Sequence, residues 1–292
     1  MVDVGVTSKD NTVDTLTIGG DLEVRRQGFG AMRITGDGIW GPPDDPEEAK
    51  RLLRRVVELG IDLIDTADSY GPEVSENLIA EALHPYPDGL VIATKGGLLR
   101  TGPGRWPSDA RPEHLRKACE ASLRRLKLDR IDLYQLHSPD SRVPFEDSVG
   151  ALKGLQDEGK IRHIGISNVS VEELERARAI ARVVTVQNRY SLEDRHSEDV
   201  LEACEEAEIG FIPWFPLATG RLAESGGPLD RIAREHDATP AQIALAWLLA
   251  RSPVMLPIPG TSSVEHLEED VAALRIELTP EEVAEIGRAS EG

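Results

Sequence analysis

Apolar positions along this 292-residue chain follow two alternating patterns, short continuous runs and longer segments of helical period. Short continuous apolar runs are typical of parallel strands that are covered on both faces. The runs predict strands near 27–30 and at 63–65, 90–94, 131–136, 161–166, 183–187, 209–214 and 255–258. The amphipathic segments predict helices at 47–59, 75–83, 112–126, 145–158, 171–180, 197–206, 229–236 with 241–249, and 263–274. Strands and helices therefore alternate through most of the chain.

Eight strand–helix pairs are the number that closes a (β/α)8 barrel of about 250 residues. Ahead of them, two short apolar runs flank Gly19-Gly20, which predicts a β-hairpin with a two-residue turn. No repeat or linker interrupts this order, and the Gly- and Pro-rich stretches 36–46 and 96–112 are expected to be loops. The predicted fold is an α/β, single-domain (β/α)8 TIM barrel over residues 1–292, with the N-terminal β-hairpin closing its bottom.

The chain is strongly acidic, with 33 Lys and Arg against 52 Asp and Glu and a formal net charge of −19. Such a surface repels phosphate backbones and lacks a basic membrane anchor, so neither nucleic acid nor a membrane is an expected partner. The longest apolar stretch, Ile243–Ala250, is too short to cross a bilayer, and the N-terminus lacks the apolar core of a secretory signal. Cys119 and Cys204 have neither metal-ligand spacing nor a disulfide pattern. We expect a soluble, cytoplasmic protein without a bound metal.

Candidate catalytic groups follow the predicted strands, at the end where (β/α)8 barrels carry their active sites. Taken singly, each has an ordinary role: Asp65 is suited to cap a turn, and His137 to a structural hydrogen bond. Together, an Asp, a Lys, a His and a Tyr at one mouth form an acid–base unit whose pKa values depend on one another. The polar and aromatic groups at these positions are Asp65, Tyr70, Lys95, His137, Asn168, Gln187 and Trp214.

Within this unit, we expect Asp65 to keep the Lys95 ammonium charged. The ammonium is expected to stabilise the Tyr70 phenolate and to lower the pKa of the phenol from its usual value of about 10. A phenol of this kind donates a proton to a substrate oxygen, as carbonyl reduction requires. The alternative is a Schiff base on Lys95, as in barrel aldolases, and that chemistry needs a neutral lysine. A charged Lys95 favours reduction.

Several sequence blocks, in order along the chain, resemble those of the aldo-keto reductase family. They are Gly28-Phe-Gly-Ala-Met-Arg33, Asp65-Thr-Ala-Asp-Ser-Tyr-Gly71, Thr94-Lys95, Leu136-His137, Gly165-Ile-Ser-Asn168, Val186-Gln-Asn188, Trp214-Phe-Pro-Leu217 and Ile258-Pro-Gly-Thr-Ser-Ser263. Within the family, Gly38-Ile-Trp-Gly-Pro-Pro43 and the segment 258–270 are most similar to bacterial pyridoxal-reductase-type members.

The resemblance implies an NADPH-dependent oxidoreductase that binds its cofactor on a barrel, without a Rossmann domain. Asp65, Tyr70, Lys95 and His137 match the family's catalytic tetrad. Tyr70 would protonate the carbonyl oxygen as hydride arrives, Lys95 and Asp65 would tune it, and His137 would orient the carbonyl. The expected cofactor is NADPH/NADP+, with NADH as a weaker alternative, and the expected substrate is a small aldehyde or ketone. A cofactor-sensing regulatory subunit on the same fold is the competing function.

The resemblance also implies where the cofactor and substrate bind. The matching cofactor-binding positions are Gly30, Met32, Arg33, Asp65, Ser167, Asn168, Gln187, Trp214, Phe215, Leu217, Thr219, Gly220, Pro259, Gly260, Thr261, Ser262, His266, Glu269 and Asp270. Trp40, Trp106 and His137 are the candidate substrate pocket. Many family members carry cations at the positions of Gly260 and His266, and Asn at that of Asp270. We therefore expect a modest preference for NADPH over NADH.

Overall fold

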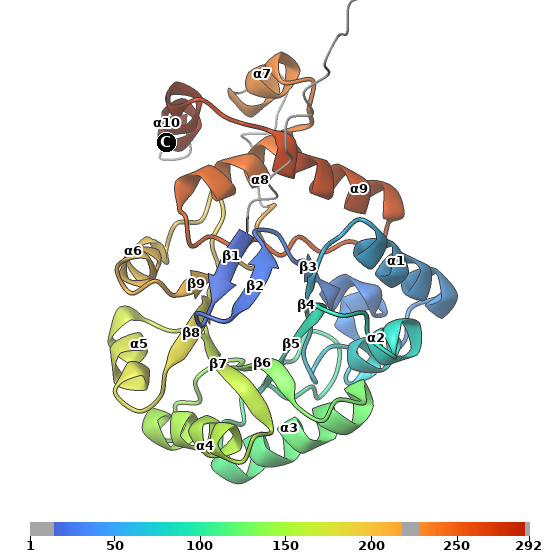
Figure 1. The fold of residues 1–292 in the computed structure, drawn as a ribbon, viewed down its shortest axis with the longest axis vertical. Helices are drawn as coiled ribbons and strands as arrows, with labels where there is room; N and C mark the ends of the chain where they lie inside the picture. Colours follow the sequence, from blue (N-terminus) through green and yellow to red (C-terminus); the bar gives the residue numbers. More distant parts are fainter. Residues whose placement is uncertain (1–14, 218–227, 290–292) are drawn as a thin grey trace, which may run out of the picture.

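The computed structural model describes residues 15–217 and 228–289, and its centre is a curled parallel sheet of seven strands (Figure 1). The strands lie side by side in the order in which they occur along the chain. They are β3 (Phe29–Gly30), β4 (Leu63–Asp65), β5 (Val91–Gly96), β6 (Ile131–Leu136), β7 (Ile161–Ser167), β8 (Val183–Gln187) and β9 (Gly210–Phe211). Parallel neighbours in chain order require a crossover between each pair, and helices supply it.

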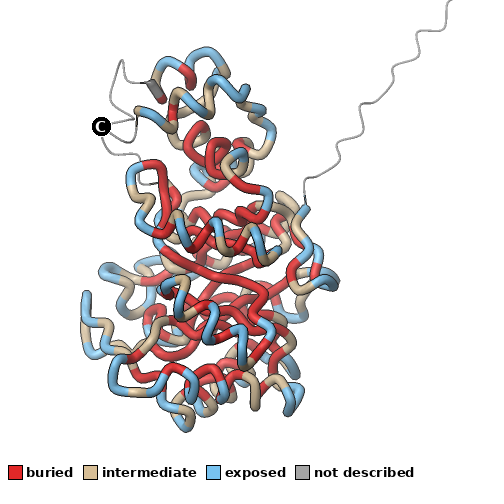
Figure 2. The backbone as a smooth tube through the Cα atoms, turned by 90° about the vertical axis from the view of Figure 1, so that its left-hand side faces the viewer, coloured by how far each residue is buried: buried red, intermediate tan, exposed pale blue. Residues whose placement is uncertain are grey.

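Helices form a layer around the outside of the sheet (Figure 1). They are α1 (Pro46–Glu58), α2 (Val74–Leu83), α3 (Pro112–Leu126), α4 (Phe145–Asp157), α5 (Val171–Arg178), α6 (Glu198–Glu206), α8 (Pro240–Arg251) and α9 (Val264–Ala272). Helix α7 (Pro228–Glu235) lies beyond α8, farther from the sheet. Short 3-10 turns lie at Ala31–Ile34, Asp37–Ile39 and Ala273–Arg275. Figure 2 shows that the buried backbone follows the sheet and the inward faces of these helices. The predicted strand–helix alternation is confirmed for these elements.

The expected strand at 255–258 is absent as a regular strand from the described residues. Its segment still bridges the two ends of the sheet: the Leu256 N–H donates to the Phe211 carbonyl, and the Gly30 N–H donates to the Pro259 carbonyl. Pro257 and Pro259 have no N–H with which to continue a ladder, so only the bridge between Phe211 and Met255 remains. The same limit shortens β9, which precedes Pro213.

A further helix, α10 (Pro280–Ala289), follows residue 274, where no element was predicted. Thr279 begins it with a reciprocal cap: its hydroxyl accepts from the Glu282 N–H, and the Glu282 carboxylate accepts from the Thr279 N–H. The Thr-Pro-Glu-Glu sequence at 279–282 contains this signal.

The N-terminal hairpin consists of β1 (Thr15–Ile18) and β2 (Leu22–Arg25), paired antiparallel. Gly19 and Gly20 between them have φ of 61° and 82°, a conformation that suits glycine in hairpin turns. The side chains of Ile18, Leu22 and Val24 are buried in one cluster with apolar residues of the central sheet. The hairpin therefore packs its apolar face against the sheet.

An irregularity in β8 changes which of its side chains face the inside of the curled sheet. Ile164 of β7 pairs with Val183, but the next residue, Gly165, pairs with Thr185, so Val184 is an extra residue. Val184 packs in the inner cluster with the hairpin, and regular alternation would then direct Gln187 to the opposite face. The bulge absorbs the extra residue, so that Gln187 still pairs with Ser167 and its amide reaches Asp65 on the inner side.

Candidate active site

Neighbouring strands place polar side chains at one end of the curled sheet. Alternation puts Leu63 and Asp65 of β4 on the same face, and likewise Ala93 and Lys95 of β5. Leu63 and Ala93 belong to the inner apolar cluster, so Asp65 and Lys95 also face inward, one step nearer the strand ends. Gln135 of β6 lies next to Lys95 in register. The strand interiors are therefore apolar, and their carboxyl ends carry the polar centre.

Lys95 is fully buried, and its ammonium has three oxygen partners. Its Nζ lies 2.5 Å from Oδ2 of Asp65, 2.9 Å from the carbonyl of Thr66 and 3.4 Å from the hydroxyl of Tyr70. An ammonium has three N–H donors, so these contacts use all of them. Burial alone would lower the pKa of Lys95, but the charge of Asp65 and the hydrogen bonds raise it above its usual value. Lys95 is therefore charged, as expected.

The second carboxylate oxygen of Asp65 is held by two glutamines. Oδ1 accepts from Nε2 of Gln135 at 3.0 Å and from Nε2 of Gln187 at 2.9 Å. Gln135 was not identified from the sequence, although its place one strand beyond Lys95 was a usable signal. Gly165 makes room for it, since a Cβ there would lie 2.7 Å from Cγ of Gln135. Asp65 is thus fixed on both oxygens before any ligand binds.

Tyr70 lies in the loop between β4 and α2 and is only 7% exposed. Its pKa is raised above the usual value, first because burial disfavours the phenolate, and further because the charge of Asp65 opposes that of Lys95. Lys95 lowers this pKa, as expected, but burial outweighs its effect, so the expectation of a pKa below the usual value is wrong. The physical consequence is that Tyr70 stays protonated at neutral pH and is a hydrogen-bond donor.

His137 directly follows β6, and its ring lies edge-on to that of Tyr70, with 5.8 Å between centroids. Its Nδ1 is 3.4 Å from the hydroxyl of Ser69. Burial, and then the charge of Lys95, hold the pKa of His137 well below its usual value. The imidazole is therefore neutral, with Nε2 left for another partner.

A cavity of about 980 Å³ opens above these groups. Most of the residues selected from the sequence line it: Gly30, Met32, Arg33, Asp65, Tyr70, Trp106, His137, Ser167, Asn168, Gln187, Trp214, Phe215, Leu217, Pro259, Gly260, Thr261, Ser262 and His266. Lys95 lies beneath its wall, and Trp40, Glu269 and Asp270 do not line it. Thr219 and Gly220 lie outside the described residues. Ile39 and Leu98 are wall residues that the sequence did not identify.

One end of the cavity is rich in amide groups. The Ser167 hydroxyl donates to the Gln187 carbonyl at 2.6 Å, and Nδ2 of Asn168 donates to the His137 carbonyl at 2.9 Å. Asn168 has a φ of 58°, a left-handed conformation that asparagine tolerates. Its Oδ1 accepts from Nε1 of Trp214 at 3.0 Å, which fixes the indole ring at the cavity wall. Gln187 keeps its Oε1 available as an acceptor.

The other end of the cavity lies at the start of α9. Ser263 is the N-cap, and its hydroxyl accepts from the His266 N–H at 3.4 Å. The amides of this first turn, with the Thr261 and Ser262 hydroxyls, are suited to an anion. Asp270, one turn after His266, is buried, and burial raises its pKa to about 7. Asp270 was expected among the cofactor-binding positions, but it does not line the cavity.

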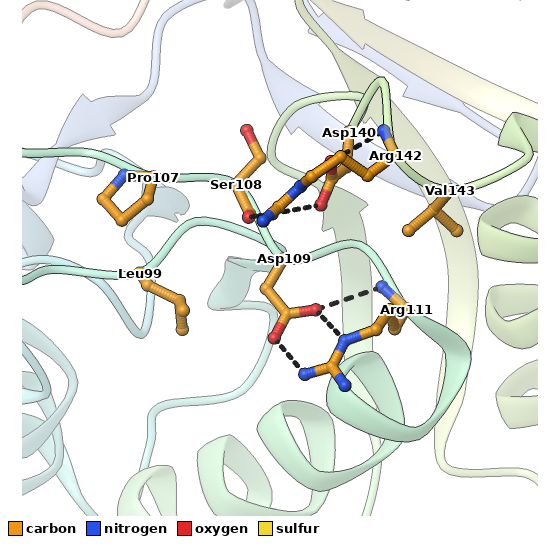
Figure 3. A pocket seen from close by; sticks show the side chains of 8 residues that line it. All are labelled: Leu99, Pro107, Ser108, Asp109, Arg111, Asp140, Arg142 and Val143. Atoms are coloured by element: carbon orange, nitrogen blue, oxygen red, sulfur yellow. Dashed lines mark hydrogen bonds and ion pairs between the residues drawn. The ribbon is translucent and has the colours of Figure 1, made fainter.

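A second, smaller cavity of about 450 Å³ lies between the loops that follow β5 and β6 (Figure 3). Two ion pairs line it: Asp109 with Arg111 at 2.7 Å, and Asp140 with Arg142 at 2.8 Å. Each arginine is paired with its own aspartate, so the cavity has no free charge to offer a ligand. The Asp140–Arg142 pair instead connects the two loops, because Arg142 also donates to the Ser108 carbonyl.

Among residues 15–217 and 228–289, no cluster of three or more His, Cys, Asp or Glu could hold a metal ion. Within the same ranges, no helix is long and apolar enough to span a membrane.

Comparisons with known proteins agree with this geometry. Residues 27–291 match the model of the aldo/keto reductase family. An uncharacterized oxidoreductase of Schizosaccharomyces pombe is 51% identical, with 96% of this chain and 92% of the relative covered. The pyridoxine 4-dehydrogenase of Escherichia coli is 42% identical, with 92% and 95% covered.

Solved structures are also similar. A thermostable aldo-keto reductase in complex with the inhibitor epalrestat superposes with a TM-score of 0.84 at 33% identity, covering 94% of this chain and 99% of the other. An aldo/keto reductase from Klebsiella pneumoniae in complex with NADP and acetate gives 0.81 at 31% identity, covering 94% of each chain.

The fold and the site together define an oxidoreductase built on a curled parallel sheet, with a buried Asp–Lys–Tyr centre. The chain belongs to the aldo/keto reductase family and is an NAD(P)H-dependent enzyme.

Proposed function

We propose that the protein reduces aldehydes, and some ketones, to alcohols with NADPH as the hydride donor and Tyr70 as the proton donor. The contact that carries this proposal is the 3.4 Å approach of Lys95 Nζ to the Tyr70 hydroxyl. A protonated phenol faces the cavity, and a charged ammonium stands behind it. This is the arrangement required of a general acid whose anion must be stabilised after it gives up its proton.

The cavity residues fit a nicotinamide dinucleotide. Oε1 of Gln187 and Oδ1 of Asn168 are acceptors suited to a carboxamide NH2, and the fixed indole of Trp214 offers a face for the ring. The first turn of α9, with Thr261, Ser262 and His266, would hold the phosphate end. Similar structures are described in complex with NADP and with NADPH. When bound, the cofactor supplies the hydride.

The protein's own residues would handle the carbonyl oxygen and the proton. Neutral His137 orients the carbonyl through Nε2, and the Tyr70 hydroxyl donates its proton to the same oxygen. As negative charge forms on Tyr70, its attraction to Lys95 strengthens, which lowers the barrier selectively in the transition state. Asp65, held by Gln135 and Gln187, keeps Lys95 in place.

The Schiff-base alternative is disfavoured by the same contacts. A lysine nucleophile must be neutral with a free lone pair, whereas Lys95 is charged and donates to three oxygens.

We also propose that the curled sheet is a complete (β/α)8 barrel, closed by the segment 254–259, with the β1–β2 hairpin covering its bottom. The hydrogen bonds from this segment to β3 and β9 support the closure, and the burial of Ile18, Leu22 and Val24 supports the cover.

The test is an NADPH-oxidation screen with pyridoxal, aryl aldehydes, methylglyoxal and sugars. We expect turnover with at least one aldehyde in the parent enzyme and none above background in Tyr70→Phe. NADPH binding by both proteins, measured by fluorescence titration, is the control that the cofactor site is intact. Cofactor binding without turnover of any carbonyl compound in the parent would point to the regulatory alternative instead.

A further inference from the structure

Arg100, in the loop after β5, connects two loops on the same side of the cavity. Its Nη1 donates to the carbonyl of Ile39 at 2.6 Å, and its Nη2 to the carbonyl of Gly38 at 2.9 Å. Its guanidinium also lies 3.6 Å above the ring of Trp106 and 5.6 Å from that of Trp40. Within the described residues these carbonyls, the Gly102 carbonyl and the two rings are its partners, and no carboxylate pairs with it.

The loop that Arg100 holds is in an unfavourable conformation. Ile39 has a φ of 57°, a left-handed value that a β-branched residue rarely adopts, and Gly38 has 66°. Such a residue keeps this conformation only where its surroundings determine it. The loop's other end is fixed by the Gly41 N–H, which donates to the Gly71 carbonyl at 2.5 Å. Arg100 provides the second attachment, on the carbonyls of the strained Ile39 and of the adjacent Gly38.

Both loops carry walls of the cavity. Ile39 and Trp106 line it together with Tyr70 and His137. Trp106 also packs edge-on against the Tyr70 ring, with 6.4 Å between centroids at 83°. One face of the Trp106 ring is covered by the guanidinium, so the position of the ring beside the proton donor depends on Arg100.

We propose that Arg100 is a specificity-determining positioning residue, which holds Ile39 and Trp106 as one apolar wall beside Tyr70. This wall selects carbonyl compounds with a planar ring as substituent, because a flat ring contacts both side chains while its carbonyl reaches Tyr70. An unbranched aliphatic aldehyde makes little use of the wall. The inference rests on the proposed carbonyl reduction and adds the substrate class.

The test compares Arg100→Met, Arg100→Lys and the parent enzyme on benzaldehyde, 4-carboxybenzaldehyde and butanal. Arg105→Met is the matched control, because it removes the same charge from an exposed position of the same loop. For Arg100→Met we expect kcat/KM to fall about 10–100-fold for both aryl aldehydes, mainly through KM, which is the range of a lost apolar substrate contact. In the same variant, kcat/KM for butanal and the Kd for NADPH should change by less than about threefold, and so should all of these constants in Arg105→Met. The kcat/KM of Arg100→Lys for the aryl aldehydes should lie between those of the parent and Arg100→Met, because an ammonium lacks the planar fork that reaches two carbonyls and stacks on a ring.

Three kinetic results would overturn the proposal. An equal loss for butanal and the aryl aldehydes, or no loss at all, would mean that Arg100 does not set the aryl-specific wall. A loss confined to 4-carboxybenzaldehyde would mean that the guanidinium binds substrate charge instead. Calorimetric titration with benzamide, an unreactive aryl analogue, gives a measurement that needs no turnover. If the parent reduces no carbonyl compound, the proposed function fails. Weaker benzamide binding by Arg100→Met than by Arg105→Met would still support the apolar wall. Equal benzamide binding by the two variants would reject it.

Discussion

Oδ2 of Asp65 and Nζ of Lys95 form a 2.5 Å ion pair in which both side chains are almost completely buried. A buried pair of this kind is strongly coupled to stability, because removing one partner leaves the other charge without compensation. For Lys95→Met we expect loss of turnover and a decrease in the free energy of unfolding of about 3–5 kcal/mol. The double variant Asp65→Asn/Lys95→Met should recover much of that stability without recovering activity. Urea unfolding of the three proteins measures the difference, and a Lys95→Met protein as stable as its parent would contradict the pairing.

Tyr70→Phe tests the proton donor without disturbing the ion pair beneath it. General acid catalysis is typically worth about 10²–10⁴-fold in rate, so kcat should fall at least that far. The affinity for NADPH should stay within about twofold, because the phenol makes none of the amide contacts at the other wall. Steady-state rates and cofactor titration check both. Retention of a substantial part of the parental kcat would show that another group supplies the proton.

Trp214→Ala tests the ring face proposed for the nicotinamide. Loss of stacking on an aromatic side chain is worth about 1–3 kcal/mol, so the Kd for NADPH should rise about 5–150-fold. Trp214→Phe is the control, since it keeps a ring and loses only the hydrogen bond from Nε1 to Asn168. Its Kd should lie close to that of the parent. Equal weakening in both variants would assign the effect to the hydrogen bond.

The phosphate end predicts a modest preference for NADPH over NADH. Arg33 is the one Lys or Arg among the described residues that line the cavity, and the start of α9 itself offers backbone amides, the Thr261 and Ser262 hydroxyls and His266. Contacts with a helix N-terminus are worth about 0.3–1 kcal/mol each, so a preference of about 10–100-fold in kcat/KM is expected. His266→Arg should increase it, and His266→Gln should not. If the preference for NADPH exceeded about 10⁴-fold and neither substitution of His266 altered it, the 2′-phosphate would have to bind elsewhere.

Asp270 predicts a pH dependence of stability. Its pKa is about 7 in the folded protein, against an ordinary value near 4, so the folded state binds the proton more tightly. Stability therefore falls as pH rises from about 4 to 7, and the deficit is complete above pH 7. Asp270→Asn should stabilise the protein by about 2–4 kcal/mol at pH 8 and have little effect at pH 4. Thermal unfolding across this range checks it, and an equal gain at both pH values would contradict a titrating carboxyl.

Most helices and strands were predictable from the sequence. Helices that bury one face repeat apolar residues with the helical period, and strands that bury both faces are short continuous apolar runs. Asp65, Lys95 and His137 could be located for the same reason, as each follows an apolar run at a strand end. Gln135 was missed because it lies inside such a run, and only the register beside Lys95 reveals it. The direction of the Tyr70 pKa was also beyond the sequence, since it depends on how far burial outweighs one nearby charge. The left-handed conformation of Ile39 was also not predictable, since contacts from distant residues accompany it, among them the hydrogen bond from Arg100 to its carbonyl.

The extra residue in β8 is absorbed within one step of the ladder, so the contacts at the strand end do not depend on it. Val183 pairs with Ile164 before the irregularity and Gln187 pairs with Ser167 after it, and deleting Val184 would leave a regular ladder between these two pairs. Gln187 would keep its hydrogen bond to Asp65, and the loss would be the packing of Val184 in the apolar cluster with the hairpin. A relative with a gap of one residue at this position should therefore still hold the carboxylate with both amides.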